Sequence, residues 1–583
     1  MADLSAPQWA LAPGVRRVEC GRVVIGGSPM TIMRLTEAGA AVLDRALGRA
    51  ASPGGAPVAS VAERALLARL ERRGMLVATP VALSPDELGG LLGELTVVVP
   101  VRDDADGVAA LLASLAAGSN RLPMRTLVVD DASTHPQRLA RVAKRFGAEL
   151  IRCDRSGGPG AARTIGLAAV TTPWVAFLDA DTTVATGWLG TAGAHLRDDR
   201  VSTGSTGPRI ALVAPRVMPE VSQGVVRLTR DRMVEGRRTA RSPMAKLAAY
   251  ERAHSPLDLG ADGGTITAGT RLSYAPSAAW LVRVDAIRRL GGFDAGLRYG
   301  EDVDLIWRLV DAGWVARYDP RSRVKHRVRP TVPGWVEQRF RYGTSAAPLA
   351  VRHRGALSPV VVSPWSAAAW GLVVVGHPLA GLAVTAGSTG VLARRLDVAD
   401  PAAEALRLAG RGTLLAGFQL ARALIRPWWP VTVVAACRWR RGRVLAAAGL
   451  AASAIHGRSV VAIADDVAYS TGVWWGVAVE VRRRPSAVVA VLGAVVPGFG
   501  GGPARRGDAL LKRLRSALGR GERAVGDRGS DNNDDDTTST GGSSTDEPTE
   551  DEAHRLGLKK QRRSERPRAP KPIEKKNDGG GSW

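Results

Sequence analysis

Residues 93–350 alternate short apolar runs with amphipathic stretches, and this alternation constrains the fold more than any other feature of the chain. Four runs predict strands, at 95–101, 126–134, 148–153 and 174–181. The stretches between them, 106–117, 136–146 and 160–169, predict helices. Strands that alternate with helices build an α/β domain around a largely parallel sheet. Polar residues at the strand ends lie where an open α/β sheet binds its ligands.

Carboxylates end two of these predicted strands. Asp179 and Asp181 follow the apolar run WVAFL, which is expected to be buried. Two carboxylates at this spacing can hold Mg²⁺ or Mn²⁺, and phosphate oxygens then complete the coordination shell of the cation. Asp130 and Asp131 end the second predicted strand, where a carboxylate can accept hydrogen bonds from a nucleotide base or ribose. The alternative at that position is a helix N-cap supplied by the residues that follow.

A glycine-rich turn, GGPGAARTIGL at 157–167, leads into the third predicted helix. Small residues let the backbone approach a phosphate, and a helix N-terminus favours anions. Arg163 adds a positive charge at this position. The pattern is typical of a phosphate-binding turn, although many turns without a ligand share it.

Three further groups of polar residues follow. Glu301 and Asp302 begin an amphipathic helix after a glycine, where a carboxylate either caps the helix or acts as a general base. His326 becomes a candidate metal ligand if a metal lies nearby. The run Gln338-Arg339-Phe340-Arg341-Tyr342 carries two arginines suited to a charged diphosphate.

Together these pieces resemble the inverting family 2 glycosyltransferases with a GT-A fold. They appear in the family's order over residues 93–350: TVVVPVRD, VVDDAST, GGPGAARTIGL, FLDADT, GGFD with GEDVDL, VKH and QRFRYG. Tyr342 stands where chain-extending members have Trp in the QxxRW motif, and this puts the acceptor-holding role of that motif in doubt.

The resemblance implies a role for each matching residue, as follows. Asp302, with Glu301 beside it, is expected to be the catalytic base. The expected metal ligands are Asp179, Asp181 and His326, with Mg²⁺ or Mn²⁺ as the cofactor. The expected contacts to the nucleotide sugar are Pro100, Asp103, Asp130, Asp131, Arg163, Asp179, Gln338 and Arg341.

The first 88 residues predict a separate small domain. Strand-like runs with a Gly26–Gly27 turn precede a helix from about residue 35 to Leu47, capped by Thr36, and a second helix at 61–73 is ended by Gly74. LTEAGAAVLDRALGRA and ERALLARLERRGMLVA resemble the PqqD-like winged-helix domains that hold precursor peptides. A generic packing domain is the alternative.

Residues 355–498 are expected to associate with a membrane. The stretch 355–393 contains no Asp, Glu, Lys or Arg, and later uncharged runs are flanked by arginines such as Arg438, Arg440 and Arg441. The long run has room for one long or two short spans, and the shorter runs suit interfacial helices. The arginine flanks favour a cytoplasmic face. A soluble Ala- and Val-rich helical domain is the alternative.

The chain ends in a charged tail, 499–583, that is expected to be disordered because it cannot bury a core. The formal charge of the whole chain is +25, and basic chains often bind nucleic acid. No zinc-finger, helix-turn-helix or RNA-binding aromatic signature accompanies this charge. The charge is instead shared between the α/β domain and the arginine flanks, so we expect no nucleic-acid partner.

A closer resemblance is to the mycofactocin glycosyltransferases, over about residues 10–480. The PqqD-like head, the α/β domain, ERAHSPLDLGADGG at 251–264 and the hydrophobic C-terminal part carry it. It implies transfer of glucose from a UDP-sugar to a peptide-derived redox cofactor or its precursor, building a β-linked oligosaccharide at the cell membrane. The alternatives are a membrane exopolysaccharide or glycolipid synthase, and a non-catalytic peptide carrier.

Overall fold

The computed structural model describes residues 8–48, 60–116, 122–197, 209–220, 243–329, 331–496 and 498–499. The predicted disordered tail, apart from its first residue, lies outside the described residues. All the elements below belong to one compact unit, residues 1–517.

The N-terminal module has the helices that the sequence predicts. Helix α1 (Glu37–Ala46) begins after Thr36, whose hydroxyl accepts a hydrogen bond from Gly39 N at 3.1 Å. Helix α2 (Val61–Arg72) begins at a capping box formed by Ser60 and Glu63. The strands are β1 (Gln8–Leu11), β2 (Arg16–Val18), β3 (Val23–Gly26), β4 (Thr31–Arg34) and β5 (Leu76–Thr79). β1 pairs with β5, and β2, β3 and β4 form an antiparallel sheet.

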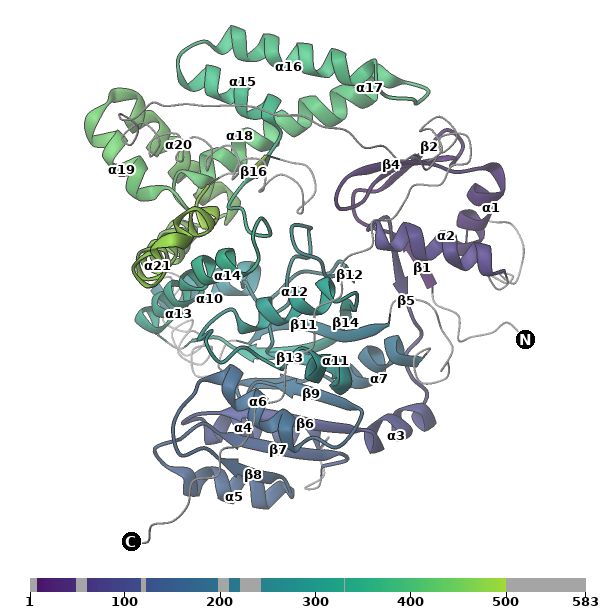
Figure 1. The fold of residues 1–583 in the computed structure, drawn as a ribbon, viewed down its shortest axis with the longest axis vertical. Coiled ribbons are helices and arrows are strands. Elements are labelled where there is room, and N and C mark those ends of the chain that lie inside the picture. Colours follow the sequence, from purple (N-terminus) through teal and green to yellow (C-terminus); the bar gives the residue numbers. More distant parts are fainter. Residues whose placement is uncertain are drawn as a thin grey trace, which may run out of the picture. The chain divides into compact units, whose positions relative to one another are not determined.

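A nine-stranded mixed sheet forms the centre of the molecule, in the order β10-β14-β11-β13-β9-β6-β7-β8 with β12 paired to β14. The parallel part consists of β6 (Leu95–Val101), β7 (Arg125–Asp130), β8 (Glu149–Arg152) and β9 (Trp174–Leu178). The remaining strands are β10 (Thr182–Val184), β11 (Ile210–Glu220), β12 (Gly264–Thr265), β13 (Ala279–Arg283) and β14 (Val315–Arg327). The predicted α/β architecture is therefore confirmed, and β6 to β9 lie side by side in Figure 1.

Helices cover both faces of the parallel strands. Apolar side chains of α4 (Ala105–Leu115) and α5 (Pro136–Phe146) pack with Val97, Val99 and Val128 on one face. Residues of α6 (Pro159–Ala169) pack with Val98 and Val129 on the other. Successive residues of a strand point to opposite faces of the sheet. A strand that is covered on both faces therefore needs a continuous apolar run, as these strands have.

The α/β domain begins before its predicted start at residue 93. Helix α3 (Pro85–Gly93) begins at Ser84, and its Leu91 is buried in the core of the α/β domain. Glu87 pairs with Arg197, which holds the pKa of the Glu87 carboxyl at about 2. The domain therefore starts before α3, just after β5.

The helices around and beyond this sheet follow in chain order. Those of the α/β domain are α7 (Trp188–Gly193), α10 (Pro243–His254), α11 (Val284–Arg289), α12 (Glu301–Asp311), α13 (Val332–Thr344) and α14 (Ala346–Arg352). Those of the C-terminal region are α15 (Pro364–Val374), α16 (Pro378–Ala393), α17 (Pro401–Ala405), α18 (Arg411–Ala423), α19 (Trp429–Arg438), α20 (Arg440–His456), α21 (Val461–Arg483) and α22 (Val488–Val491). Two short strands, β15 (Val361–Val362) and β16 (Gly498–Phe499), pair in parallel. Short 3₁₀ helices cover Ala194–Leu196, Pro485–Ala487 and Leu492–Ala494, and a π-helical turn covers Leu406–Gly410.

The C-terminal helices are joined to the α/β domain where α21 crosses α13. Gly343 of α13 and Gly472 of α21 meet so closely that a Cβ on either would run into the backbone of the other helix. A buried ion network reinforces the crossing: Arg339 of α13, 2% exposed, contacts Glu251 of α10 and Asp465 of α21. Helix α21 is thus fixed to the α/β domain by both packing and charge.

No single described helix is both long and apolar enough to cross a bilayer. Helices α20 and α21 meet that test only as a pair, and the chain bends by 111° between them. The predicted membrane association of 355–498 therefore stays a prediction, and it is considered again below.

Candidate active site

Glu301 and Asp302 begin helix α12 at the edge of the sheet. Gly300 precedes them with φ at 80°, and a Cβ there would come within 2.8 Å of the Ser345 side chain, so glycine is required. Asp302 Oδ1 accepts a hydrogen bond from Val303 N at 2.8 Å, and Oδ2 accepts one from Ser277 N at 3.3 Å. Asp302 forms no ion pair within the described part of the chain. Its half-buried carboxylate can therefore take a proton from a bound hydroxyl.

Arg163 binds the neighbouring acids. Its side chain is 2% exposed; it donates to Asp179 Oδ1 at 2.6 Å and to Glu301 Oε1 at 2.9 Å. The same guanidinium lies 5.5 Å from the centre of the Phe293 ring. Arg163 was predicted to contact the nucleotide sugar, but here it is an internal brace between the end of β9 and the start of α12. Glu301, held by this brace, is less available as a base than Asp302.

Burial sets the protonation of this acidic pair. Desolvation, together with the charge of Asp302, raises the pKa of Glu301 to about 7. Desolvation also raises the pKa of Asp302, and its backbone hydrogen bond and Arg163 act against that rise. Two carboxylates this close titrate as a pair, and the charge of Asp302 helps Glu301 to keep its proton.

This pair predicts the pH dependence of the reaction. Desolvation raises the pKa of Asp302, and a base can accept a proton only when it is deprotonated, so the acid limb of kcat/KM, about tenfold per pH unit, should lie above the ordinary pKa of an aspartate. Glu301 keeps its proton up to about pH 7 and so carries little charge over this limb; Glu301→Gln keeps an oxygen for Arg163 and should leave the limb where it is. A pH profile of both proteins checks this. A wild-type limb near pH 4 would contradict the assignment.

A second cluster lies where β10 meets β14. Thr182 of β10 stands opposite His326 of β14, and His326 Nε2 lies 3.2 Å from Asp181 Oδ1. Desolvation opposes charge on both groups, but their mutual attraction raises the pKa of His326 and brings that of Asp181 to about 2. Arg329 comes within 3.8 Å of Asp181 Oδ2, a neighbour that the sequence did not single out.

These residues supply part of a metal site. A carboxylate and an imidazole are both ligands for Mn²⁺ or Mg²⁺-type cations, and Asp181 and His326 already face one another. Among the described residues no group of three or more His, Cys, Asp or Glu is arranged to hold a metal. Asp179, the third predicted ligand, is bonded to Arg163 instead. Asp181 and His326 therefore fit a cation that takes its remaining ligands from the substrate and water, and the three-residue set stays a prediction.

The loops after β6, β7 and β8 hold the predicted nucleotide contacts. Asp131 accepts hydrogen bonds from Ser156 Oγ at 2.8 Å, Gly157 N at 2.8 Å and Gly158 N at 3.0 Å. The glycine-rich turn therefore binds an acid of the protein here, where the sequence predicts a phosphate.

The other predicted nucleotide contacts are similarly engaged. Asp130 is fully buried; it accepts from Ser133 N at 2.8 Å and pairs with Arg152. Asp103 accepts from Thr134 N at 2.6 Å, and this bond lowers the pKa of its carboxyl. Pro100 lies buried within β6. Each lies at or near the carboxyl edge of the sheet, but its role toward a nucleotide stays a prediction.

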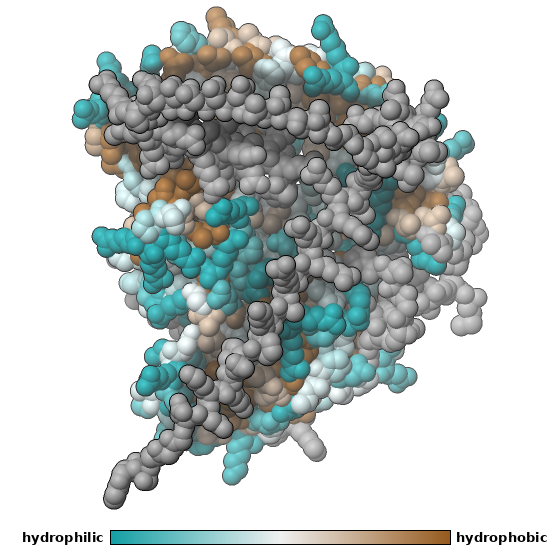
Figure 2. All heavy atoms as spheres, in the orientation of Figure 1, coloured by the Kyte–Doolittle hydropathy of each residue, from teal (hydrophilic) through white to brown (hydrophobic). Residues whose placement is uncertain are grey.

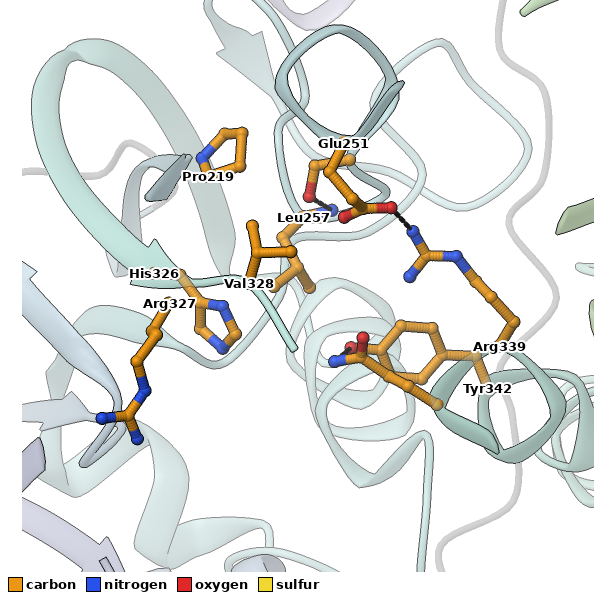
Figure 3. Close-up of a pocket in the computed structure, with 10 residues that line it drawn as sticks. Pro219, Glu251, Leu257, His326, Arg327, Val328, Arg339 and Tyr342 are labelled. Atoms are coloured by element: carbon orange, nitrogen blue, oxygen red, sulfur yellow. Dashed lines mark hydrogen bonds and ion pairs between the residues drawn. The ribbon is translucent and has the colours of Figure 1, made fainter. Parts of the chain in front are cut away.

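A pocket opens beside the second cluster. Figure 3 shows His326, Glu251 and Tyr342 around it, with Arg339 joined to Glu251. Gln338 Nε2 donates to Tyr342 Oη at 2.9 Å on the same wall. The pocket is lined by Pro219, Glu251, Ser255, Leu257, His326, Arg327, Val328, Gln338, Arg339 and Tyr342. Burial raises the pKa of Glu251, while Arg339 and Trp335 Nε1 act against the rise.

The two arginines of the QRFRY run lie on different sides of α13, and of the two Arg339 lines this pocket. Arg341 pairs with Glu337 one turn earlier on the exposed side of α13, and its guanidinium lies 6.0 Å from the centre of the Tyr299 ring. Arg339 is buried against Glu251 and Asp465. The expectation that both arginines face a diphosphate is therefore wrong for Arg339, because neighbouring carboxylates neutralise it inside the protein.

Two functional candidates, Glu251 and Arg329, were missed from the sequence alone. Glu251 lies in the quoted segment 251–264, but nothing local marks it as a pocket residue. Arg329 carries no motif. Both reach the site through contacts between elements far apart in the chain, α10 with α13 and β14 with the end of β9.

Comparison with known families covers both halves of the α/β domain and part of the C-terminal region. The chain matches the model of glycosyl transferase family 2 over residues 96–237. It matches the model of glycosyl transferase family group 2 over residues 269–396.

Two curated relatives come from Mycobacterium tuberculosis. A pre-mycofactocin glycosyltransferase is 35% identical over 497 residues, which cover 81% of this chain and 94% of the relative. An uncharacterised glycosyltransferase is 30% identical over 256 residues, which cover 42% of this chain and 93% of the relative. Among solved structures, a mannosyltransferase from Pyrobaculum calidifontis in complex with GDP-Man and Mn²⁺ is 17% identical; the match covers 68% of this chain and 90% of that one, with a TM-score of 0.37.

Proposed function

The chain belongs to glycosyltransferase family 2, together with the pre-mycofactocin glycosyltransferases, and from this membership we propose that it transfers glucose from UDP-glucose to the mycofactocin precursor with inversion. Its α/β domain is the GT-A-like fold of such transferases. The observation that carries the proposal is the Asp302 carboxylate, unpaired within the described residues and beside the braced acids Asp179 and Glu301.

The proposed reaction is a single displacement. The acceptor hydroxyl lies within reach of Asp302, which takes its proton as the oxygen attacks the anomeric carbon. The new carbon–oxygen bond forms as the bond to the diphosphate breaks, and UDP leaves with that electron pair. Arg163 keeps Glu301 and Asp179 fixed while this happens, so the start of α12, which carries Asp302, stays in place.

Asp181 and His326 would hold a divalent cation, Mg²⁺ or Mn²⁺. When bound, such a cation supplies neutralisation of charge on the leaving diphosphate. Arg329, half-exposed beside Asp181, adds a cationic group on the same side. We infer that the donor end of the site lies near His326, because Asp181 and His326 stand next to the pocket.

We infer that the acceptor binds at the mouth of the small pocket between α10, α13 and β14. It offers one buried carboxyl, Glu251, and the linked Gln338 and Tyr342 side chains, which can bind hydroxyl groups of an acceptor. Tyr342 replaces the Trp of chain-extending relatives and presents a hydroxyl where Trp presents a ring N–H. This pocket supports a polar acceptor over a purely apolar one.

Product analysis tests the proposal. Purified full-length protein is incubated with the precursor, Mn²⁺ or Mg²⁺, and a panel of UDP-sugars, and the acceptor is examined by mass spectrometry. We expect hexose addition to the precursor, most efficiently from UDP-glucose. Transfer to lipid extracts but not to the precursor would favour a glycolipid or exopolysaccharide synthase, and the absence of turnover with any donor would favour a peptide carrier.

The N-terminal module gives a second test of the acceptor. We propose that residues 8–79 hold the peptide-derived acceptor, so their removal should lower transfer to it by roughly 10²-fold through loss of effective concentration. The cut falls after β5, because α3 belongs to the α/β core. Slow hydrolysis of the UDP-sugar serves as the control and should persist. Unchanged transfer to the precursor would contradict a peptide-holding role.

A further inference from the structure

Exposed apolar side chains gather on one part of the molecule. Among the described residues, six of the exposed large apolar side chains precede Val361, and twenty-three lie between Val361 and Val496. Figure 2 shows apolar surface over the region that Figure 1 labels α15, α16 and α19. Soluble monomers rarely leave so much contiguous apolar surface in water.

The hairpin of α15 and α16 is the clearest part of this surface. Helix α16 has sixteen residues without a charge, and Gly381 alone among them is buried, against Ala369 of α15. Leu379 and Leu382 are 80% and 65% exposed, and Val373, Val374 and Val375 are exposed at the turn between the helices. A helix that is apolar all round is stable only when something covers it.

The junction of α19 and α20 adds charge to the same surface. Val431, Val433 and Val434 of α19 and Val444 of α20 are exposed around Trp439, which is 62% exposed. Four arginines are interleaved with them and exposed: Arg438, Arg440, Arg441 and Arg443. Arg441 donates to the Val375 carbonyl at 3.0 Å, so this basic cluster borders the turn of the hairpin. No carboxylate of the described chain pairs with these four arginines.

We propose that this surface, the apolar hairpin α15–α16 with the arginine cluster 438–443, inserts into one leaflet of a bilayer that contains anionic lipid. The four arginines favour an anionic membrane over a second copy of the chain as the partner of this surface, because a second copy would bring the same positive charges together. Apolar side chains, an interfacial tryptophan and arginines in one surface are the composition of helices that lie in a membrane interface. The arginines place it on the cytoplasmic leaflet.

The dimensions favour insertion into one leaflet over a crossing. Helices α15 and α16 are about 16 Å and 24 Å long, and the hydrocarbon core is about 30 Å thick. Helix α21, which would complete the bent α20–α21 pair, is packed on α13, and its Asp465 and Asp466 pair with Arg339, Arg422 and Arg426. The anchored chain therefore keeps its site at the membrane surface, where the precursor and UDP-sugar arrive from water.

Vesicle sedimentation with the full-length protein tests this inference. Vesicles of phosphatidylcholine, with and without phosphatidylglycerol, are used at low and high salt. We expect binding that is stronger on the anionic vesicles and weakens with salt. Leu379→Glu with Leu382→Glu should lower partitioning by roughly tenfold or more per substitution. Replacing the four arginines of the cluster by Gln should lower binding to anionic vesicles by roughly 10²-fold and remove the salt dependence.

Two controls distinguish a loss of membrane binding from a loss of folding. Val81→Glu introduces the same charge at an exposed apolar side chain outside the surface and should leave binding unchanged. Thermal unfolding of each variant should match wild type, since Leu379 and Leu382 make little contact with the protein. Unchanged vesicle binding in the leucine variants would overturn the proposal. So would a concentration-dependent dimer that the leucine variants dissociate, with no binding to either vesicle.

Discussion

Asp302→Asn should abolish sugar transfer while UDP binding remains within a fewfold of wild type. The amide cannot take the proton of the acceptor hydroxyl, and general-base catalysis of this kind contributes about 10²–10⁴-fold to a rate. The substitution keeps the shape of the side chain and an oxygen for the backbone N–H of Val303 or Ser277. The loss should therefore fall on kcat, measured as product formation under saturating donor and acceptor.

A matched substitution on the same helix serves as the control. Asp311 ends α12 on its exposed side, and Asp311→Asn should leave kcat unchanged. Calorimetric titration with UDP separates a catalytic loss from a binding loss. An Asp302→Asn protein that turns over at a near wild-type rate would show that another group takes the proton.

Arg339→Met should destabilise the fold by about 3–5 kcal/mol, because it leaves buried carboxylates without their cation. Arg339 is 2% exposed and neutralises Glu251 of α10 and Asp465 of α21 at once. Trp335 Nε1 and Tyr250 Oη each still donate one hydrogen bond, at 2.7 Å and 2.8 Å, but neither supplies a charge. We expect a lower midpoint of thermal unfolding and a loosened acceptor pocket.

Arg341→Met is the control for this result. Arg341 lies on the same helix and pairs with Glu337 on the exposed side, where such a pair contributes about 1 kcal/mol or less. Its unfolding midpoint should stay close to wild type. Equal effects of the two substitutions, measured by calorimetry, would contradict the view that the buried network joins α10, α13 and α21.

Local patterns predicted the elements well because each depends on residues near one another. β6 covers the predicted 95–101, α5 the predicted 136–146, and α1 begins after Thr36 as its capping side chain requires. The resemblance to the family 2 glycosyltransferases likewise implied that Asp179, Glu301 and Asp302 belong to one site.

The partners of the charged side chains could not be predicted, because they depend on contacts across the fold. Asp131 accepts hydrogen bonds from Gly157 N and Gly158 N. Arg163 bridges Asp179 to Glu301, and Glu301 lies 138 residues after Arg163 in the chain. Nothing in the sequence around Arg339 distinguishes it from Arg341, yet helix α13 turns one into the interior and the other outward. Arg339 is buried because it lies on the face of α13 that α10 and α21 cover. A single sequence does not show which face of a helix is covered.

The configuration of the first glycosidic bond tests the central claim most directly. The claim is that Asp302 activates the acceptor for a single displacement at the anomeric carbon of an α-linked UDP-sugar. The product of the wild-type reaction is isolated and its anomeric proton is examined by NMR. The account predicts a β-glycoside of the precursor; an α-glycoside would contradict it.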